Sequence, residues 1–194
     1  MGAVTWDPQG YENEIRDDIE DFDLLQGMVV KATRTRPARR ILELGVGSGI
    51  TAELLLAAHP EATLHGIDSS PEMLAAARRR LPSERVTLEE RALQEGLPSG
   101  PFDLVASNLA IHHLVSEEKE DLYRRIFNVV EPGGAFVLGD CVVARDPTQA
   151  VIEIEEGFDF PDPIDDQVEW LGRAGFEPRI YWERRDLAVF LCLR

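Results

Sequence analysis

Residues 41–49 read Ile-Leu-Glu-Leu-Gly-Val-Gly-Ser-Gly, an apolar strand that runs directly into three glycines at alternate positions. Because glycine has no Cβ, the chain can turn sharply at Gly45, Gly47 and Gly49, and a ligand can lie against its backbone. Apolar residues then recur with helical spacing over residues 50–58. The first amides of that helix have no intrahelical partner and point at the turn. The stretch therefore predicts a strand–turn–helix unit of an α/β protein, with a ligand-binding turn.

The spacing of these glycines decides between two kinds of nucleotide ligand. A dinucleotide-binding turn has the pattern G-x-G-x-x-G, which places its third glycine at position 50. That position is Ile50, and the pattern here is Glu-x-Gly-x-Gly-x-Gly from Glu43 to Gly49. An NAD(P)-linked oxidoreductase is therefore disfavoured.

Length and composition indicate a single globular unit. The 194 residues are 44% hydrophobic, which suits one compact domain with a full core. No run of 18 apolar residues occurs, so we predict no transmembrane helix and no membrane partner. The first 30 residues carry acids where a secretory signal needs a basic start and an apolar stretch. We therefore expect a cytoplasmic protein.

The net charge of −16 argues against a nucleic-acid partner. Proteins that bind nucleic acids usually present a basic surface, and an acidic surface repels an anionic polymer. Short basic clusters occur at 34–40 and 78–80, where solvated helix ends and turns account for them. We expect no nucleic acid, and a monomer or homodimer that acts on a small molecule.

Strand and helix patterns alternate along the chain. Strands are predicted at 40–45, 63–67, 86–88, 102–107 and 135–141. Helices are predicted at 11–33, 49–58, 71–81 and 164–174, and a further helix is expected to be capped by Ser116. Residues 131–134 read as a turn and residues 144–163 as an acidic loop. The chain ends in two strands, 176–182 and 187–193, which form a hairpin. This order predicts a doubly wound sheet with helices on both faces.

Asp68 ends the second predicted strand, in Leu64-His65-Gly66-Ile67-Asp68. Its place after Gly45 is close to that of the ribose-binding acids of nucleotide folds. A carboxylate can accept hydrogen bonds from both ribose hydroxyls. Asp68 could instead cap the helix at Ser70, but the glycine motif upstream favours the ribose role.

Three further segments follow in order, Asp68-Ser-Ser-Pro-Glu-Met-Leu, residues 89–95, and Phe102-Asp-Leu-Val-Ala-Ser-Asn-Leu-Ala-Ile-His-His-Leu. Together with 43–49, they resemble the motifs of the class I, Rossmann-like S-adenosylmethionine-dependent methyltransferases. The resemblance covers roughly residues 38–194. It implies an α/β fold with a seven-stranded, mostly parallel sheet whose last strand lies antiparallel beside the fifth. Residues 38–194 would form the S-adenosylmethionine-binding domain, and residues 1–37 a helical lid region.

The resemblance also implies which residues hold S-adenosylmethionine. These are Glu43, Gly45, Gly47, Gly49, Asp68, Ser69, Met73, Ala92, Leu93 and Asn108. Ser69 and Met73 would lie near the adenine, and Asn108 with its neighbouring carbonyls would receive the ammonium group of the cofactor. Where the family usually carries an Asp that reads the adenine amino group, residues 89–95 contain none. A backbone amide of Ala92 or Leu93 could replace it.

Two residues are candidates for catalysis. His112 could act as a general base, and Asp140, at the end of the fifth strand, could orient a substrate. His113 is adjacent to His112, and two adjacent histidines at a helix start are not expected to reach one metal ion. We therefore expect no metal. A sulfonium methyl is already activated, so the protein needs mainly to orient the acceptor and exclude water.

Two segments could cover the acceptor. One is the N-terminal region, where Tyr11 and Arg16 are candidate substrate contacts together with His112, and the other is the loop 144–163. The acids of that loop lack calcium-loop spacing, so we expect them to be solvated. The absence of a second domain favours a small-molecule acceptor, and the sequence does not indicate whether O, N, C or S is methylated. A non-catalytic S-adenosylmethionine-binding module and an RNA or protein methyltransferase remain as alternatives.

Overall fold

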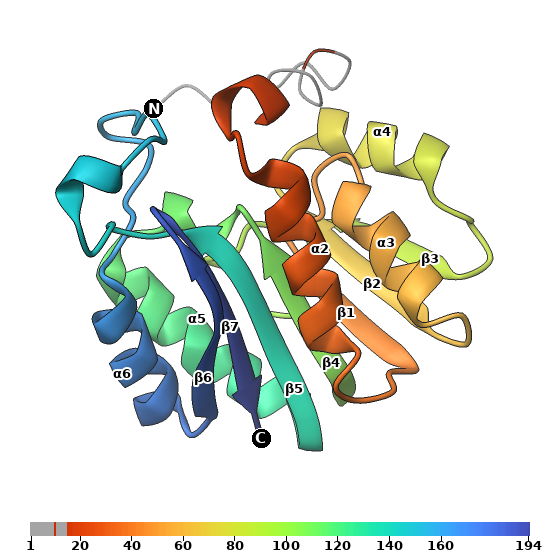
Figure 1. Cartoon of the computed structure of the whole chain (residues 1–194). Helices are drawn as coiled ribbons and strands as arrows, with labels where there is room; N and C mark the ends of the chain where they lie inside the picture. Colours follow the sequence, from red (N-terminus) through yellow and green to blue (C-terminus); the bar gives the residue numbers. More distant parts are fainter. Residues whose placement is uncertain (1–9, 11–14) are drawn as a thin grey trace.

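A computed structural model describes residue 10 and residues 15–194 of the chain. One seven-stranded sheet with the order β3-β2-β1-β4-β5-β7-β6 forms its centre (Figure 1). The strands are β1 (Arg40–Leu44), β2 (Thr63–Asp68), β3 (Val86–Glu90), β4 (Phe102–Asn108), β5 (Val130–Cys141), β6 (Glu177–Arg184) and β7 (Leu187–Leu193). The helices are α2 (Phe22–Thr33), α3 (Ile50–Ala58), α4 (Pro71–Arg80), α5 (Ser116–Val129) and α6 (Ile164–Ala174), with short 3₁₀ turns η1 (Ile111–His113) and η2 (Pro147–Gln149).

The sheet confirms the expected topology. Strands β1 to β5 are mutually parallel, while β7 lies antiparallel between β5 and β6. The last strand is thus inserted beside the fifth. All five parallel strands end at the same edge of the sheet, where α/β proteins bind their ligands.

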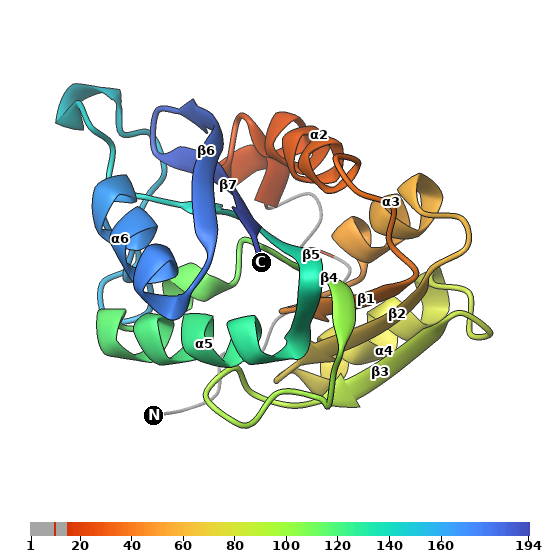
Figure 2. The ribbon, with the colours of Figure 1, turned by 90° about the horizontal axis from the view of Figure 1, so that it is seen from below.

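Helices cover both faces of the sheet, as Figures 1 and 2 show. Alternate residues of each strand point to opposite faces, so Ile41 belongs to one core and Leu42 to the other. The first core contains residues of α2, α3 and α4, and the second contains residues of α5 and α6. The near-continuous apolar runs of β4 and β5 follow from burial on both sides.

Local signals set most of the boundaries. Ser70 accepts a hydrogen bond from the amide of Met73 and caps α4, with Pro71 at its first position. Gly175 ends α6 in a left-handed conformation with φ 112°. Helix α2 starts only at Phe22, because a turn at 20–21 separates it from a short helical segment at 15–18.

Two local predictions were wrong. Ser116 does not cap α5: the N-cap position is Val115, and the Ser116 hydroxyl instead donates to Asp162 (2.9 Å). Residues 131–134 are not a separate turn but part of β5. Phe102 pairs with Val130 and Leu104 with Ala135, so the segment bulges while the strand continues.

Helix α2 packs into the main core. Phe22, Leu25 and Val29 of α2 are buried in the core that covers β5 and β7. None of the described helices is long and apolar enough to span a lipid bilayer.

Helix α2 can pack closely on β5 because residue 139 is glycine. A Cβ there would lie 2.3 Å from Val29 Cγ2 and 2.5 Å from Asn108 Oδ1. We predict that Gly139→Ala lowers the free energy of unfolding by about 1–3 kcal/mol. Gly172→Ala is the control, since its Cβ meets nothing within 4 Å on α6, and it should raise stability by about 0.5–1 kcal/mol. Urea unfolding measures both, and equal effects would contradict the packing argument.

Candidate S-adenosylmethionine site

A cavity of about 1150 Å³ lies at the carboxyl edge of the parallel strands. The turns after β1, β2, β3 and β4 line it, together with residues from 15–26 and 151–159. These last two segments lie far apart in sequence and border the cavity from the N-terminal region and the acidic loop. The buried Thr51 hydroxyl donates to Gln26 Oε1 (3.0 Å), which ties α2 to α3 beside the cavity.

The three glycines of the first turn have different roles, although all have positive φ. A Cβ on Gly45 would lie 2.3 Å from Ala110 Cβ, and one on Gly49 would lie 3.1 Å from Leu81 Cδ1. Gly45 thus lets the turn after β4 approach, and Gly49 lets α3 approach α4. Gly47 alone of the three has nothing within 4 Å of the Cβ position and lines the cavity. Bare backbone is therefore exposed to a ligand at Gly47.

Asp68 joins the first two turns and lines the cavity. Its Oδ2 accepts a hydrogen bond from the Gly47 amide (2.8 Å), and its Oδ1 accepts one from the Ser70 amide (2.9 Å). Burial raises the pKa of Asp68, and the backbone amides partly oppose this rise. Each oxygen retains capacity for a further hydrogen bond, so the carboxylate can support the turn and bind ribose hydroxyls at once. Ser70 rather than Asp68 caps α4, and Asp68 supports the turn before the helix while keeping capacity for ribose hydroxyls.

Glu43 and Asn108 are buried polar side chains with unsatisfied atoms. Oε2 of Glu43 and Oδ1 of Asn108 have no hydrogen-bond partner within the described part of the chain. Burial, followed by the charge of Asp68, raises the pKa of Glu43 well above its ordinary value. Asn108 lines the cavity, and its free acceptor suits a donor such as an ammonium group.

The second and third turns form another wall of the cavity. Ser69 is exposed to it, while Met73 is only 3% exposed and contacts both cavity and core. Leu93 lines the cavity but Ala92 does not. Arg91 lines it too, a residue that the sequence analysis did not select, and its amide donates to the Asp68 carbonyl (2.9 Å).

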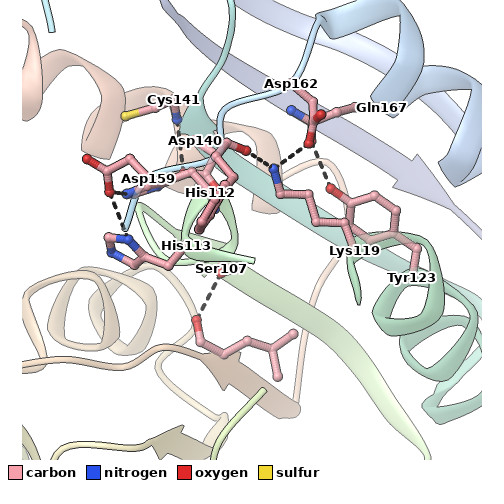
Figure 3. Close-up of polar contacts among 12 residues, drawn as sticks. Ser107, His112, His113, Lys119, Tyr123, Asp140, Cys141, Asp159, Asp162 and Gln167 are labelled. Atoms are coloured by element: carbon pink, nitrogen blue, oxygen red, sulfur yellow. Dashed lines mark hydrogen bonds and ion pairs between the residues drawn. The ribbon is translucent and has the colours of Figure 1, made fainter. Parts of the chain in front are cut away.

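His112 and Asp140 form a buried pair (Figure 3). Asp140 Oδ1 lies 2.5 Å from His112 Nδ1, and Oδ2 accepts a hydrogen bond from the His112 amide (3.0 Å). The Cys141 amide donates to Oδ1 as well (2.9 Å). Asp140 is 2% exposed and does not line the cavity, whereas His112 does. Asp140 therefore orients the imidazole, and Nε2 is left for a ligand.

Asp159, which the sequence analysis expected to be solvated, instead contacts this pair (Figure 3). Its Oδ1 lies 3.0 Å from His113 Nδ1 and 3.7 Å from His112 Nε2. The His113 ring packs against Phe158 with centroids 4.3 Å apart. Burial, then the neighbouring His112, lowers the pKa of His113 to about 4, so this imidazole is neutral at pH 7. No local sequence pattern indicated these contacts, because they join residues more than 40 positions apart.

The expected substrate contacts in the N-terminal region have mixed outcomes. Tyr11 lies outside the described residues. The Arg16 guanidinium contacts Asp23 (3.2 Å) and lies over the Phe22 ring. Arg16 is not among the residues that line the cavity, whereas its neighbours Ile15 and Asp17 are.

These residues fit S-adenosylmethionine. The open turn at Gly47 accommodates backbone contact with the nucleoside, and Asp68 offers free acceptor capacity for its sugar. The unpartnered Asn108 Oδ1 provides an acceptor for its ammonium group.

Comparisons with known proteins point to a methyltransferase. A methyltransferase-domain family model matches residues 41–134. An uncharacterized methyltransferase of Anoxybacillus flavithermus is 30% identical over 159 residues, which cover 81% of this chain and 71% of that protein. A trans-aconitate 2-methyltransferase of Methylobacterium nodulans is 35% identical over 130 residues, covering 61% of this chain and 49% of that protein.

Solved structures share the fold. The S-adenosylmethionine-dependent methyltransferase SibL superposes with a TM-score of 0.74 at 22% identity, over 89% of this chain and 55% of SibL. The DhpI–SAH complex gives a TM-score of 0.74 at 19% identity, over 95% of this chain and 92% of DhpI. The chain thus spans about half the length of SibL and of the trans-aconitate methyltransferase.

The fold and the glycine turn define a Rossmann-like protein that takes S-adenosylmethionine as its methyl donor. The chain belongs to the class I S-adenosylmethionine-dependent methyltransferase family.

A side chain at position 47 would affect ligand binding and also strain the backbone, and a control variant can separate these two effects. We predict that Gly47→Ala weakens S-adenosylmethionine binding at least tenfold, because the new methyl group occupies cavity space, and lowers stability by about 1–2 kcal/mol. Gly133→Ala is the matched control, since Gly133 also has positive φ (86°) and open space at its Cβ position. It should show the same loss of stability with unchanged affinity. Calorimetry that finds equal affinity in both variants would remove Gly47 from the site.

The buried Glu43 predicts a pH effect on stability. Its raised pKa means that the folded protein retains a proton that the unfolded chain loses as pH rises past the ordinary pKa of 4.5. This group therefore lowers stability progressively from about pH 4.5 towards neutrality. We expect Glu43→Gln to gain stability relative to wild type over that range. Urea unfolding at several pH values measures it, with the exposed Glu84→Gln as control, and a pH-independent difference would contradict the mechanism.

Proposed function

We propose that this methyltransferase transfers the methyl group to a small-molecule acceptor by in-line displacement within the cavity. One observation carries the proposal. One cavity is lined both by the open turn at Gly47 with Asp68 and by the oriented His112. S-Adenosylmethionine, when bound, supplies an activated sulfonium methyl group, so the chain must mainly position the acceptor.

The residues divide into two groups. Gly47, Asp68 and Asn108 hold the methyl donor, with Ser69, Met73 and Leu93 beside its adenine. His112 faces the acceptor through Nε2 and receives a proton from an acceptor that arrives protonated. Asp140 fixes the tautomer of His112, because its oxygens accept from both the Nδ1–H and the backbone amide.

The size and enclosure of the cavity favour a small acceptor. Residues 15–22 and 151–159 border it, and the N-terminal region 1–37 would act as its lid. The net charge of −16 disfavours RNA. A related protein is named for methylation of trans-aconitate, which agrees with a small molecule but does not select O, N, C or S as the acceptor atom here.

The test combines a metabolite screen with site variants. Purified protein is incubated with S-adenosylmethionine and fractionated small-molecule pools, and S-adenosylhomocysteine release is measured. Any acceptor-dependent release supports the proposal. Tight S-adenosylmethionine binding with no release from any pool would favour the non-catalytic binding module instead.

Once an acceptor is found, the His112–Asp140 pair can be tested. We predict that His112→Gln lowers kcat about 100-fold and leaves the affinity for S-adenosylmethionine unchanged. Asp140→Asn should lower kcat as well, because an amide cannot enforce the same tautomer. His65→Gln is the control, since His65 pairs with Glu89 and does not line the cavity. Undiminished kcat in His112→Gln would exclude its proposed role.

A further inference from the structure

We propose that His112, His113 and Asp159 form a binding site for a divalent transition-metal ion at the acceptor end of the cavity. The site rests on the geometry of three side chains, and only its use in catalysis rests on the proposed methyl transfer. Nε2 of His112, Nδ1 of His113 and Oδ1 of Asp159 converge there (Figure 3).

The spacing suits a shared ion. All three ligand atoms lie within 4.8 Å of one another, with 3.0 Å and 3.7 Å from Asp159 Oδ1 to the two imidazoles. Imidazole and carboxylate ligands bind Zn²⁺ at about 2.0–2.2 Å, which places neighbouring ligands roughly 3–3.5 Å apart. Small side-chain rotations therefore complete the coordination.

The backbone explains why adjacent histidines can act together. The sequence argument against a metal assumed an α-helix start, where the two side chains diverge. They lie instead in the 3₁₀ turn η1, with ring centroids 4.0 Å apart and planes tilted by 54°. The δ nitrogen of one ring and the ε nitrogen of the other thus reach the same carboxylate.

The surrounding hydrogen bonds leave these three atoms available. Asp140 binds Nδ1 of His112, the carboxylate–histidine arrangement that orients metal-ligating imidazoles. Asp159 Oδ2 accepts from the Glu155 amide (2.9 Å), which leaves Oδ1 facing the histidines. Nδ1 of His113 is buried and lacks an aligned hydrogen bond in the described chain, despite its 3.0 Å distance from Asp159. A cation would satisfy the three converging acceptors.

The loop that carries Asp159 is firmly attached beside the histidines. The Phe160 amide donates to the His112 carbonyl (2.8 Å). Lys119, 1% exposed, donates to the Phe160 carbonyl and pairs with Asp162 (2.5 Å). The three ligands are therefore held together by the fold rather than by chance proximity of exposed side chains.

The ligand set selects the kind of ion. Two imidazoles and one carboxylate with open positions suit Zn²⁺, Fe²⁺, Co²⁺ or Mn²⁺, whereas Mg²⁺ and Ca²⁺ prefer oxygen ligands. His112, Asp140 and Cys141 also lie close together, but hydrogen bonds from His112 and Cys141 already occupy Asp140. An ion bound by His112, His113 and Asp159 would have open coordination positions, which an oxygen or nitrogen of the methyl acceptor could occupy. With the ion bound, His112 Nε2 is a ligand, and the proton-accepting role proposed above belongs to the metal-free protein.

The experiment uses Co²⁺ as the probe on tag-free, chelator-treated protein of the full chain. We expect one Co²⁺ per chain, with visible ligand-field absorption. Asp159→Asn and His113→Ala should each weaken Co²⁺ binding at least about tenfold. Glu156→Gln, an exposed acid of the same loop, and His65→Gln are matched controls that should bind Co²⁺ as wild type does. S-Adenosylmethionine affinity, measured in every variant, reports that the fold is retained.

The outcomes separate the two proposals. Three results would overturn the metal site. They are no saturable Co²⁺ binding, unchanged Co²⁺ affinity in both Asp159→Asn and His113→Ala, or a loss of Co²⁺ affinity in the control variants equal to that in these two. None of these results depends on finding an acceptor. Specific Co²⁺ binding without methyl transfer to any acceptor would support the metal site and count against the proposed function.

Discussion

The turns around Gly47 depend on one carboxylate, which accepts hydrogen bonds from two backbone amides. Asp68 holds the amide of Gly47 on one oxygen and that of Ser70 on the other, so a single side chain fixes the turns after β1 and β2 relative to each other. The carbonyl of the same residue accepts the Arg91 amide at the end of β3. Three neighbouring strand ends are thus set by one position, and the bare backbone at Gly47 is presented to the cavity because this support holds it there.

The part of the cavity beside His112 follows the same physical rule with different groups. Asp140 is buried and fully engaged by His112 and by the amide that follows it, so the imidazole has one orientation. The acidic loop is attached through Lys119, whose buried ammonium would be unfavourable without Asp162 and the Phe160 carbonyl. This attachment brings Asp159 to the histidines. Buried ion pairs and hydrogen bonds therefore fix the positions of the polar atoms of His112, His113 and Asp159 that lack full hydrogen bonding.

Unsatisfied polar atoms occur on two of the residues that line the cavity. Asn108 Oδ1 and His113 Nδ1 are buried and lack aligned partners in the described chain. Buried acceptors without donors are unfavourable, and the fold retains them where a ligand can complete them. Burial, and then the charge of Asp68, raises the pKa of Glu43 well above its ordinary value, which favours the neutral form of this buried carboxyl. The polar chemistry of the site is thus incomplete without its ligands.

The local sequence alone determined the first strand–turn–helix unit, the capped α4, the α6 C-terminus and the terminal hairpin, because periodicity, proline and glycine act over a few residues. It also indicated Gly47 and Asp68, whose places follow from strand ends, whereas Asn108 came from the family resemblance. The strand order came from family resemblance, since periodicity carries no information on neighbours. Only the tertiary structure placed Asp159 beside His112 and His113, turned Ser116 towards Asp162, and assigned separate packing roles to Gly45 and Gly49. These contacts join distant segments, and no pattern along the chain encodes where a loop will attach.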